Sequence, residues 1–400
     1  MLRLVKVFGC ALVALCTLAA ESKELTRAEM VARYNYVVGI HTIGSQYQFT
    51  EKTRLIETAD IILGMGSNII KFNLGPAFGR DNYAGAHPGK FNSLVELAEY
   101  EPSIARVFDM PFYYYFLWVN PMAKSEWQWR KDKKPFSEKD AKIEYQELYD
   151  LTCYLLEKYS GSGKSFYLGH WEGDWLLLRG YDRTIDPEPW CVQNMIHWLN
   201  LRQKAVDDAK HDTPHHDVAV FHYTEVNLVI KGMNGGPCLT TEVLPHVNVD
   251  FVSYSAYDAQ ANPEKSDILF KALNFIKKHL PEKKEISGPR VFIGEFGYKG
   301  AAFSPEVQCR NSIAFIKNAV TWGCPFVLYW QLYDNEFENG RYEGYWLIDD
   351  KGVKQPVYYM LEGYYRKARE YLRKNFGTDG TPPAPEKFIP KMKTLLKVTN

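Results

Sequence analysis

Strand-like and helical segments alternate along this chain from about residue 34 to residue 374. The strand-like runs are rich in Val, Ile, Tyr or Phe, and several are apolar throughout, as strands buried on both faces are. Eight are expected, at residues 36–40, 68–73, 112–119, 165–170, 217–222, 249–254, 291–295 and 326–331. Helical patterns lie between and after them, for example at residues 52–63, 138–158, 189–210, 266–279, 305–321 and 357–374. This alternation implies parallel strands with right-handed crossovers, and eight units of about 43 residues predict an α/β fold, a closed (β/α)8 TIM barrel.

A doubly wound open sheet is the main rival fold. Such a sheet commonly carries a glycine-rich phosphate turn, G-x-G-x-x-G, after its first strand. The corresponding segment here, from Gly39 to Gly44, reads Gly-Ile-His-Thr-Ile-Gly and lacks that pattern. The barrel is therefore the preferred interpretation.

Length and composition fit one large domain. A chain of 400 residues with 46% apolar content can bury the core of a single barrel. We expect the barrel to span residues 21–376, followed by a C-terminal extension over residues 377–400. Basic and acidic residues are equally numerous, 48 of each. This balance gives no electrostatic footprint for DNA, RNA or an anionic membrane, and we expect a monomer.

Residues 1–20 have the pattern of a cleavable signal peptide. Arg3 and Lys6 form a basic start, an uncharged apolar run covers residues 7–18, and small residues precede a cleavage site after Ala19 or Ala20. Twelve apolar positions are too few to span a bilayer comfortably. The sequence thus predicts a secreted or periplasmic protein without a membrane span. A lipid anchor on Cys16 is the less favoured alternative.

Five cysteines remain after removal of the signal: Cys153, Cys191, Cys238, Cys309 and Cys324. In an oxidising compartment one or two disulfides can form, and Cys191 could meet Cys238. Buried free thiols that pack as small apolar side chains are the alternative. No cysteine spacing resembles a zinc site, and we expect neither a metal nor an organic cofactor.

Two glutamates lie at the ends of strand-like runs. Glu172 follows the fourth run and Glu295 ends the seventh, 123 residues later, which is close to three strand–helix units. Both would therefore lie on the C-terminal rim of a barrel, where catalytic groups gather. A carboxylate at the mouth of an apolar core is costly unless it is paired, hydrogen-bonded or used. Glycoside hydrolysis needs two such groups, a protonated one for the leaving oxygen and an ionised one for attack or for activation of water.

The motifs around these residues resemble clan A of the retaining glycoside hydrolases, a (β/α)8 group that includes family 5 cellulases and mannanases. Residues 291–297, Val-Phe-Ile-Gly-Glu-Phe-Gly, are similar to the clan's strand-seven motif. The resemblance implies that Glu295 is the nucleophile and Glu172 the acid/base. Residues 328–334, Leu-Tyr-Trp-Gln-Leu-Tyr-Asp, resemble the clan's tryptophan strand, which implies that Trp330 is the platform under the sugar. At strand six, Tyr257 matches the tyrosine that holds the nucleophile.

Three positions depart from the clan pattern. Trp171 stands before the acid/base where the clan usually has an asparagine that binds the sugar 2-hydroxyl. Lys71 stands where strand two usually supplies an arginine, a point charge in place of a fork. Ser255 stands where family 5 has a histidine. The match is therefore to the clan, across most of residues 34–374, and the details of sugar recognition stay open.

Further residues at expected strand ends are candidates for substrate binding. They are His41, Lys71, Asn73, Asn120, His170, Trp171, Asp174, His222 and Tyr223. His170 shares strand parity with Glu172, so it either tunes that residue or is a histidine satisfied in the core. Asp174 either binds substrate or caps the next turn.

The sequence supports two hypotheses of function. The first is a secreted retaining glycoside hydrolase that cleaves an oligo- or polysaccharide by double displacement, with its carboxyl groups about 5–5.5 Å apart. The second is a degenerate carbohydrate-binding protein on the same barrel, favoured by the loss of asparagine before Glu172. A barrel enzyme of unrelated chemistry, such as a metal hydrolase, is disfavoured because no His/Asp cluster stands at the strand ends.

Overall fold

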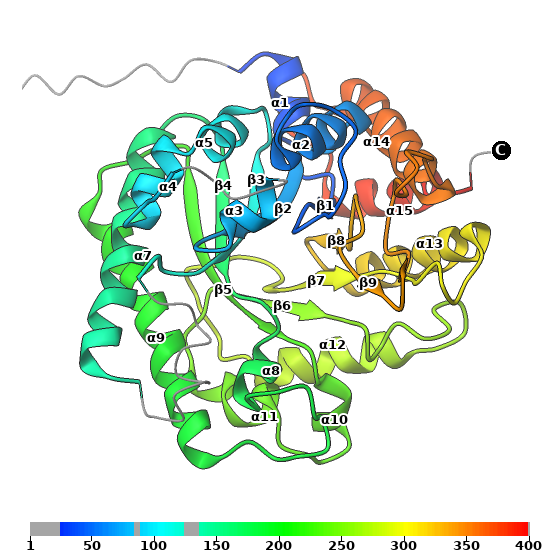
Figure 1. Cartoon of the computed structure of the whole chain (residues 1–400). Helices are drawn as coiled ribbons and strands as arrows, with labels where there is room; N and C mark the ends of the chain where they lie inside the picture. Colours follow the sequence, from blue (N-terminus) through cyan, green and yellow to red (C-terminus); the bar gives the residue numbers. More distant parts are fainter. Residues whose placement is uncertain (1–24, 84–88, 124–135, 399–400) are drawn as a thin grey trace, which may run out of the picture.

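A computed structural model of the chain describes residues 25–83, 89–123 and 136–398. Eight parallel strands follow one another around a closed barrel, and the last strand pairs with the first. The strands are β1 (Val38–His41), β2 (Ile69–Leu74), β3 (Tyr114–Val119), β4 (Ser165–Gly169), β5 (Ala219–Val226), β6 (Phe251–Ser255), β7 (Val291–Phe296) and β8 (Val327–Tyr329). The prediction of a (β/α)8 TIM barrel is confirmed (Figure 1).

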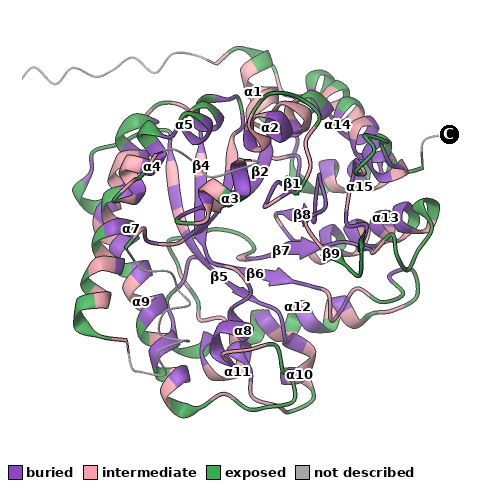
Figure 2. Cartoon of the chain, in the orientation of Figure 1, coloured by how far each residue is buried: buried purple, intermediate pink, exposed green. Residues whose placement is uncertain are grey.

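Helices surround the strands, and their barrel-facing sides are buried while their outer sides are exposed (Figure 2). The longer ones are α2 (Arg54–Met65), α7 (Glu138–Lys158), α9 (Pro189–Asp212), α12 (Ile268–His279), α13 (Pro305–Trp322) and α14 (Pro356–Asn375). Shorter helices lie in the connections: α3 (Phe78–Asn82), α4 (Leu94–Tyr100), α5 (Pro102–Asp109), α8 (Gly173–Leu177), α10 (Val229–Met233), α11 (Leu239–Glu242) and the 3-10 turn η1 (Leu244–His246). A two-stranded hairpin, β9 (Phe337–Glu338) and β10 (Arg341–Tyr342), follows β8.

Local sequence explains where several helices begin and end. Thr53, Ser137 and Ser304 cap α2, α7 and α13, each accepting a hydrogen bond from a backbone N–H of the first turn. Gly66 and Gly323 end α2 and α13 in the left-handed conformation, which glycine adopts without steric cost. These capping residues define where α2 and α13 begin and end and where α7 begins.

Strand five is longer than the sequence pattern indicated. The run was expected to end at His222, but β5 continues to Val226. The reason is its pairing with β6, in which Tyr223 lies opposite Phe251 and Glu225 opposite Ser253. The polar Thr224 and Glu225 hid this continuation, so the sequence placed the rim of strand five about four residues too early.

Aromatic side chains fill the inside of the barrel. Phe116, Tyr167, Tyr223 and Phe292 belong to one buried cluster there, with Phe116 stacked on Tyr167 at 4.4 Å between ring centroids. Gly169 of β4 makes room for Tyr223, because a Cβ at this glycine would lie 2.2 Å from the tyrosine ring. The interior is thus a packed core from its amino-terminal end up to the level of Tyr223.

The two ends of the described chain pack together on one side of the barrel. Helix α1 (Arg27–Arg33) lies against α14, and the Arg27 guanidinium donates to the carbonyls of Arg373, Phe376 and Gly377. The expected C-terminal extension forms α15 (Pro385–Leu395) and packs against α13 and α14 with Phe388 buried. The expected signal peptide lies outside the described residues. Over the described ranges, no helix combines the length and the apolar character needed to cross a bilayer.

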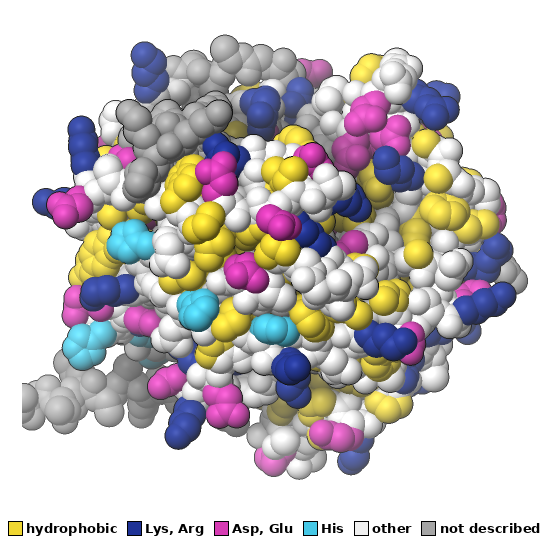
Figure 3. All heavy atoms as spheres, turned by 90° about the horizontal axis from the view of Figure 1, so that it is seen from below, with side chains coloured by type: hydrophobic (Ala, Val, Ile, Leu, Met, Phe, Trp, Pro, Cys, Tyr) yellow, Lys and Arg dark blue, Asp and Glu magenta, His cyan; other side chains and the backbone are white. Residues whose placement is uncertain are grey.

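The described cysteines are all free thiols, so Cys191 and Cys238 are buried but not joined. Of the two alternatives considered from the sequence, the structure has packed thiols. On the surface, basic and acidic side chains are interspersed over the face seen in Figure 3. That distribution agrees with the balanced composition of the chain.

We predict that Gly169→Ala destabilises the protein by about 1–3 kcal/mol, because the added methyl group overpacks the barrel interior against Tyr223. Gly64→Ala is the matched control: this glycine lies in α2 with no atom within 4 Å of an added Cβ, so the change should be neutral or slightly stabilising. Thermal and urea unfolding followed by circular dichroism measure both. Equal stability of the two variants would contradict the packing argument.

Candidate active site

One cavity of about 700 Å³ opens at the carboxyl ends of the strands. Both glutamates identified from the sequence, Glu172 and Glu295, line it. Aromatic side chains form much of the remaining wall: Trp118, Trp171, Trp175, Tyr181, Tyr257, Trp330 and Tyr345. Two carboxyl groups thus face a single aromatic-lined space.

Glu172 lies just beyond the end of β4, with 8% of its surface exposed. One carboxyl oxygen accepts from the indole N–H of Trp175 at 2.5 Å, and the other accepts from the hydroxyl of Ser255 at 2.5 Å. Burial raises the pKa of this carboxyl to about 7, the hydroxyl of Ser255 works against that rise, and the nearby charge of Glu225 adds to it. A group with this pKa can both donate and accept a proton near neutral pH.

Glu295 reaches the cavity through an irregularity in β7. The pairing register shifts between Ile293 and Phe296. As a result Phe292 packs inside the barrel while Phe296, four residues later, packs outside it against α13. Strict alternation from Phe292 would have turned Glu295 outward toward the helices. Bulges of this kind often re-aim a side chain beside an active site.

The carboxyl group of Glu295 is almost fully buried, and its Oε1 has no hydrogen-bond partner. Burial raises its pKa well above the usual range, the negative charge of Glu225 raises it further, and Lys71 acts in the opposite direction. The clan resemblance led us to expect that Tyr257 holds this group. Tyr257 does line the cavity, and the charge of Glu295 contributes to its raised pKa, but no hydrogen bond joins the two side chains.

A third glutamate, missed in the sequence, lies at the same level. Glu225 of β5 is completely buried and pairs with Lys71 of β2 at 2.9 Å. It accepts from the hydroxyl of Ser253 at 2.6 Å and from the backbone N–H of Glu172 at 3.0 Å. The available signal was the alternation Phe221, Tyr223, Glu225, which places all three side chains inside the barrel. Lys71, expected to contact substrate, is fully buried and does not line the cavity.

Trp330 lies in the cavity wall as expected, and it packs beside Trp118 with ring centroids 5.9 Å apart. Its indole N–H donates to the carboxyl group of Glu336 at 3.2 Å. Burial raises the pKa of Glu336 to about 7, and the negative charge of Asp334 contributes to this rise. Trp171 also lines the cavity, half-buried, so an indole occupies the place where the resemblance leads one to expect an amide. Glu336 and Trp118 were not singled out from the sequence.

His170 and Asp174 have structural roles in place of the expected contacts with substrate. His170 points away from the barrel axis, hydrogen-bonds Thr224 at 2.8 Å and packs on Trp198. It shares parity with Glu172, but β4 ends at Gly169 and the chain turns before Glu172, so parity no longer relates them. Asp174 is buried and accepts from the backbone N–H groups of Asn227, Leu228 and Leu239. His170 corresponds to the structural alternative considered for it, whereas Asp174 neither lines the cavity nor caps the turn that follows it.

His222 and Tyr223 lie below the rim because β5 continues beyond them. The backbone N–H of His222 donates to Asp250 just before β6, and its imidazole lies 3.4 Å from the Nε of Arg202 on α9. Tyr223 fills the barrel interior. Neither residue lines the cavity, so the expectation that they bind substrate is corrected.

His41, Asn73 and Asn120 also lie outside the cavity lining. His41 is fully buried, and its Nε2 donates to the carbonyl of Gly294 at 2.7 Å. Burial and then Lys71 lower its pKa well below 6.5, so the ring is neutral. The amide of Asn73 donates to Asp81 at 2.7 Å, and Asn120 is half-buried beside Gly75. In contrast Asn227, two residues after Glu225 and not singled out, does line the cavity.

A second hollow, of about 870 Å³, lies near the amino-terminal end of β7. Its only acidic lining residue among those described is Glu282, so it lacks a pair of carboxyl groups. Among the described residues, no cluster of three His, Cys, Asp or Glu side chains could hold a metal ion. The chemistry that the described residues offer is therefore concentrated at the carboxyl ends of the strands.

Comparison by sequence finds no matching family model and no similar curated protein. Solved structures do match. A GH5_18 protein from Streptomyces cattleya in complex with Manβ1-4GlcNAc superposes with a TM-score of 0.56 at 12% identity, over 89% of this chain and 87% of that one. A GH5_18 protein from Bifidobacterium longum gives 0.55 at 13% identity, over 90% of both chains.

A family 39 glycoside hydrolase from Bacteroides cellulosilyticus gives a TM-score of 0.50 at 9% identity over 83% of this chain, which spans 64% of that protein's length. These three structural neighbours are thus glycoside hydrolases of families 5 and 39. At these identities the likeness is one of fold. The clan-level resemblance seen in the sequence is confirmed for the barrel, and no family within the clan is assigned.

The raised pKa of Glu172 predicts a pH-dependent stability. A carboxyl whose pKa is about 7 in the folded protein and 4.5 when unfolded stabilises the fold fully below about pH 4.5 and ceases to do so as the pH rises through 7. Glu172→Gln avoids the buried charge. Its free energy of unfolding should therefore rise relative to that of wild type by up to about 3 kcal/mol between pH 5 and pH 8. Unfolding at both pH values measures this, with the exposed Glu282→Gln as control. A difference in free energy of unfolding from wild type that does not change with pH would contradict a raised pKa for Glu172.

Proposed function

We propose that this protein is a retaining O-glycoside hydrolase that cleaves an oligo- or polysaccharide by double displacement. The observation that carries the proposal is the convergence of Glu172 and Glu295 on one aromatic-walled cavity. The fold shared with family 5 and family 39 glycoside hydrolases agrees with it. Retention of configuration would require the two carboxyl groups to be about 5–5.5 Å apart.

In the first step the carboxylate of Glu295 attacks the anomeric carbon, and the bond from that carbon to the leaving oxygen breaks. Glu172 gives its proton to that oxygen, and a glycosyl ester forms on Glu295. In the second step Glu172, now ionised, takes a proton from a water molecule that attacks the same carbon and frees Glu295. A pKa of about 7 suits Glu172 for both directions of proton transfer.

The charges of the two groups favour one protonated and one ionised carboxyl, and Lys71 favours ionisation of Glu295. Glu172 and Glu225 both raise the pKa of Glu295 when they are ionised. A proton on Glu172 removes one of these negative charges and so favours the ionised form of Glu295. The protonated acid and the ionised nucleophile therefore stabilise one another, and the positive charge of Lys71 lowers the pKa of Glu295.

The proposal includes secretion. Residues 1–20 carry the basic start, apolar run and small residues of a cleavable signal, so the mature protein would act outside the cytoplasm or in the periplasm. A glycan is the substrate class that fits the aromatic wall of the cavity, because sugar faces stack on indole and phenol rings. The mechanism uses no metal ion or organic cofactor.

A carbohydrate-binding protein without hydrolytic activity is the second candidate. Two observations favour it: Trp171 replaces the amide expected before the acid/base, and Oε1 of Glu295 lacks a hydrogen-bond donor. A pure binder would retain affinity for a glycan while leaving every substrate intact. Activity on any glycoside that is lost in both glutamate variants separates the two candidates.

Aryl glycosides with different leaving groups test the roles of the two glutamates. Glu172→Gln should slow hydrolysis about 10²- to 10⁴-fold when the leaving group needs a proton. The loss should be much smaller for a dinitrophenyl leaving group, which departs without one. Glu295→Gln should be inactive by several orders of magnitude on both kinds of substrate, and Glu282→Gln should behave as wild type. Near-normal turnover in both cavity variants, on a substrate that the wild type cleaves, would refute the proposal.

A further inference from the structure

A buried ion pair lies beneath the cavity and connects the two candidate catalytic glutamates. The ammonium of Lys71 and the carboxylate of Glu225 are 2.9 Å apart, and neither side chain is exposed. They come from β2 and β5, which are three strands apart around the barrel. Such a pair costs desolvation, and an apolar pair of similar size is often as stable. The aromatic layers below show that this barrel can be filled without charge.

Each partner of the pair holds the backbone of one catalytic candidate. One oxygen of Glu225 accepts from the backbone N–H of Glu172 at 3.0 Å. The ammonium of Lys71 donates to the carbonyl of Gly294, directly before Glu295, at 3.2 Å. His41 donates to the same carbonyl at 2.7 Å. The pair thus fixes the chain at the turn after β4 and at the irregularity in β7, the two places where strand alternation is broken.

The glycine before Glu295 is needed for this arrangement. A Cβ at position 294 would lie 1.6 Å from the hydroxyl oxygen of Ser253 and 2.9 Å from a carboxyl oxygen of Glu225. Gly294 therefore allows β7 to approach the pair closely enough for its carbonyl to accept from Lys71. This gives the Gly-Glu step of the strand-seven motif a physical reason in this chain.

We propose that Lys71 and Glu225 act together as positioning residues, fixing the backbone of Glu172 and Glu295 and setting the charge that Glu295 meets. The proposal deepens the proposed function, since it assigns how that site is controlled. The groups that face Glu295 come from every side of the site: His41 on β1, Lys71 on β2, Glu172 after β4, Glu225 on β5, Tyr257 after β6 and Glu336 after β8. His41 is neutral, so Lys71 is the only cation among these six described groups.

The opposing effects of the pair make the proposal testable without a substrate. After burial, the negative charge of Glu225 is the largest cause of the raised pKa of Glu295, and Lys71 is the largest cause that lowers it. Removing either charge should move that pKa in a direction fixed by its sign. A pair that only fills space would show no such opposite shifts.

The experiment compares the full chain of wild type, Glu225→Gln, Lys71→Met and the double variant. Carbon-13 NMR of glutamate-labelled protein follows the titration of Glu295, with its signal assigned by its loss in Glu295→Gln. We expect Glu225→Gln to lower the pKa of Glu295 by about 1 unit or more, Lys71→Met to raise it by a similar amount, and the double variant to lie between them. Unchanged values, or shifts in the same direction, would overturn the proposal.

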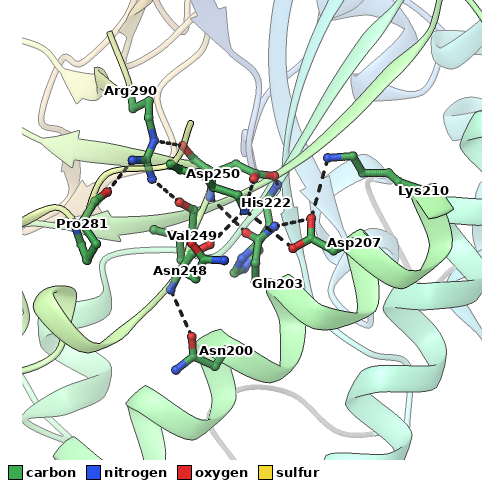
Figure 4. A network of polar contacts seen from close by, with 11 residues as sticks. Asn200, Gln203, Asp207, Lys210, His222, Asn248, Val249, Asp250, Pro281 and Arg290 are labelled. Carbon is green, nitrogen blue, oxygen red and sulfur yellow. Dashed lines mark hydrogen bonds and ion pairs between the residues drawn. The ribbon is translucent and has the colours of Figure 1, made fainter. Parts of the chain in front are cut away.

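Asp250→Asn is the matched control. Asp250 pairs with Lys283 at 2.6 Å, is buried just before β6, and belongs to the network at the amino-terminal end of the barrel (Figure 4). Breaking this pair should lower stability without moving the pKa of Glu295. A shift equal to that in Glu225→Gln would show a general effect of destabilisation and overturn the assignment.

A single variant that does not fold leaves the test intact, because a buried charge without its partner is strongly destabilising while removal of both charges is much less so. The double variant should then unfold at a higher temperature than either single variant. A double variant less stable than both would contradict the pairing. None of these readouts requires hydrolysis, so failure of the proposed enzymatic activity and failure of this inference are separately visible.

Discussion

The ion pair between Lys71 and Glu225 is the interaction on which the geometry of the candidate site depends. Below it the barrel is a packed aromatic core, and above it the cavity opens to solvent. The pair marks the boundary between these two environments, and it bonds to the chain beside both Glu172 and Glu295. A charged layer at this height converts the end of a hydrophobic core into a polar floor with defined hydrogen-bond directions.

Ionisation of the carboxyl groups around the cavity above this floor costs free energy. Glu172, Glu225, Glu295 and Glu336 lie close enough to influence one another, with Lys71 among them. Burial raises the pKa of Glu172, Glu295 and Glu336, so the folded protein disfavours full ionisation of the site. Active sites commonly carry such perturbed groups at a cost in stability. The aromatic wall adds to the effect, because it limits the solvent that could screen these charges.

The sequence predicted the architecture well because strand and helix patterns report burial directly. Eight apolar runs and their spacing were sufficient for a closed barrel, and the same spacing put Glu172 and Glu295 at one end of it. The motif around Trp330 also led to a residue of the cavity wall. In these cases the chemistry lies at strand ends, where a pattern of apolar residues stops.

What the sequence missed lies where regular alternation ends or continues unexpectedly. Glu225 was overlooked because polar residues inside a barrel strand look like a strand end, and His222 and Tyr223 were placed at the rim for the same reason. Strand alternation wrongly placed His170 on the same side as Glu172, because the chain turns after Gly169. The bulge in β7 that aims Glu295 into the cavity depends on pairing with two neighbouring strands, which a single sequence does not encode locally.

The proposed double displacement requires Glu295 to form a covalent bond with a sugar. The most direct measurement is incubation of wild type with a panel of 2-deoxy-2-fluoro glycosides bearing dinitrophenyl leaving groups, followed by intact-mass and peptide mass spectrometry. We expect one glycosyl adduct per chain with one member of the panel, located on Glu295 and absent from Glu295→Gln. An adduct on another residue, or no adduct with a sugar whose glycosides the protein hydrolyses, would contradict it.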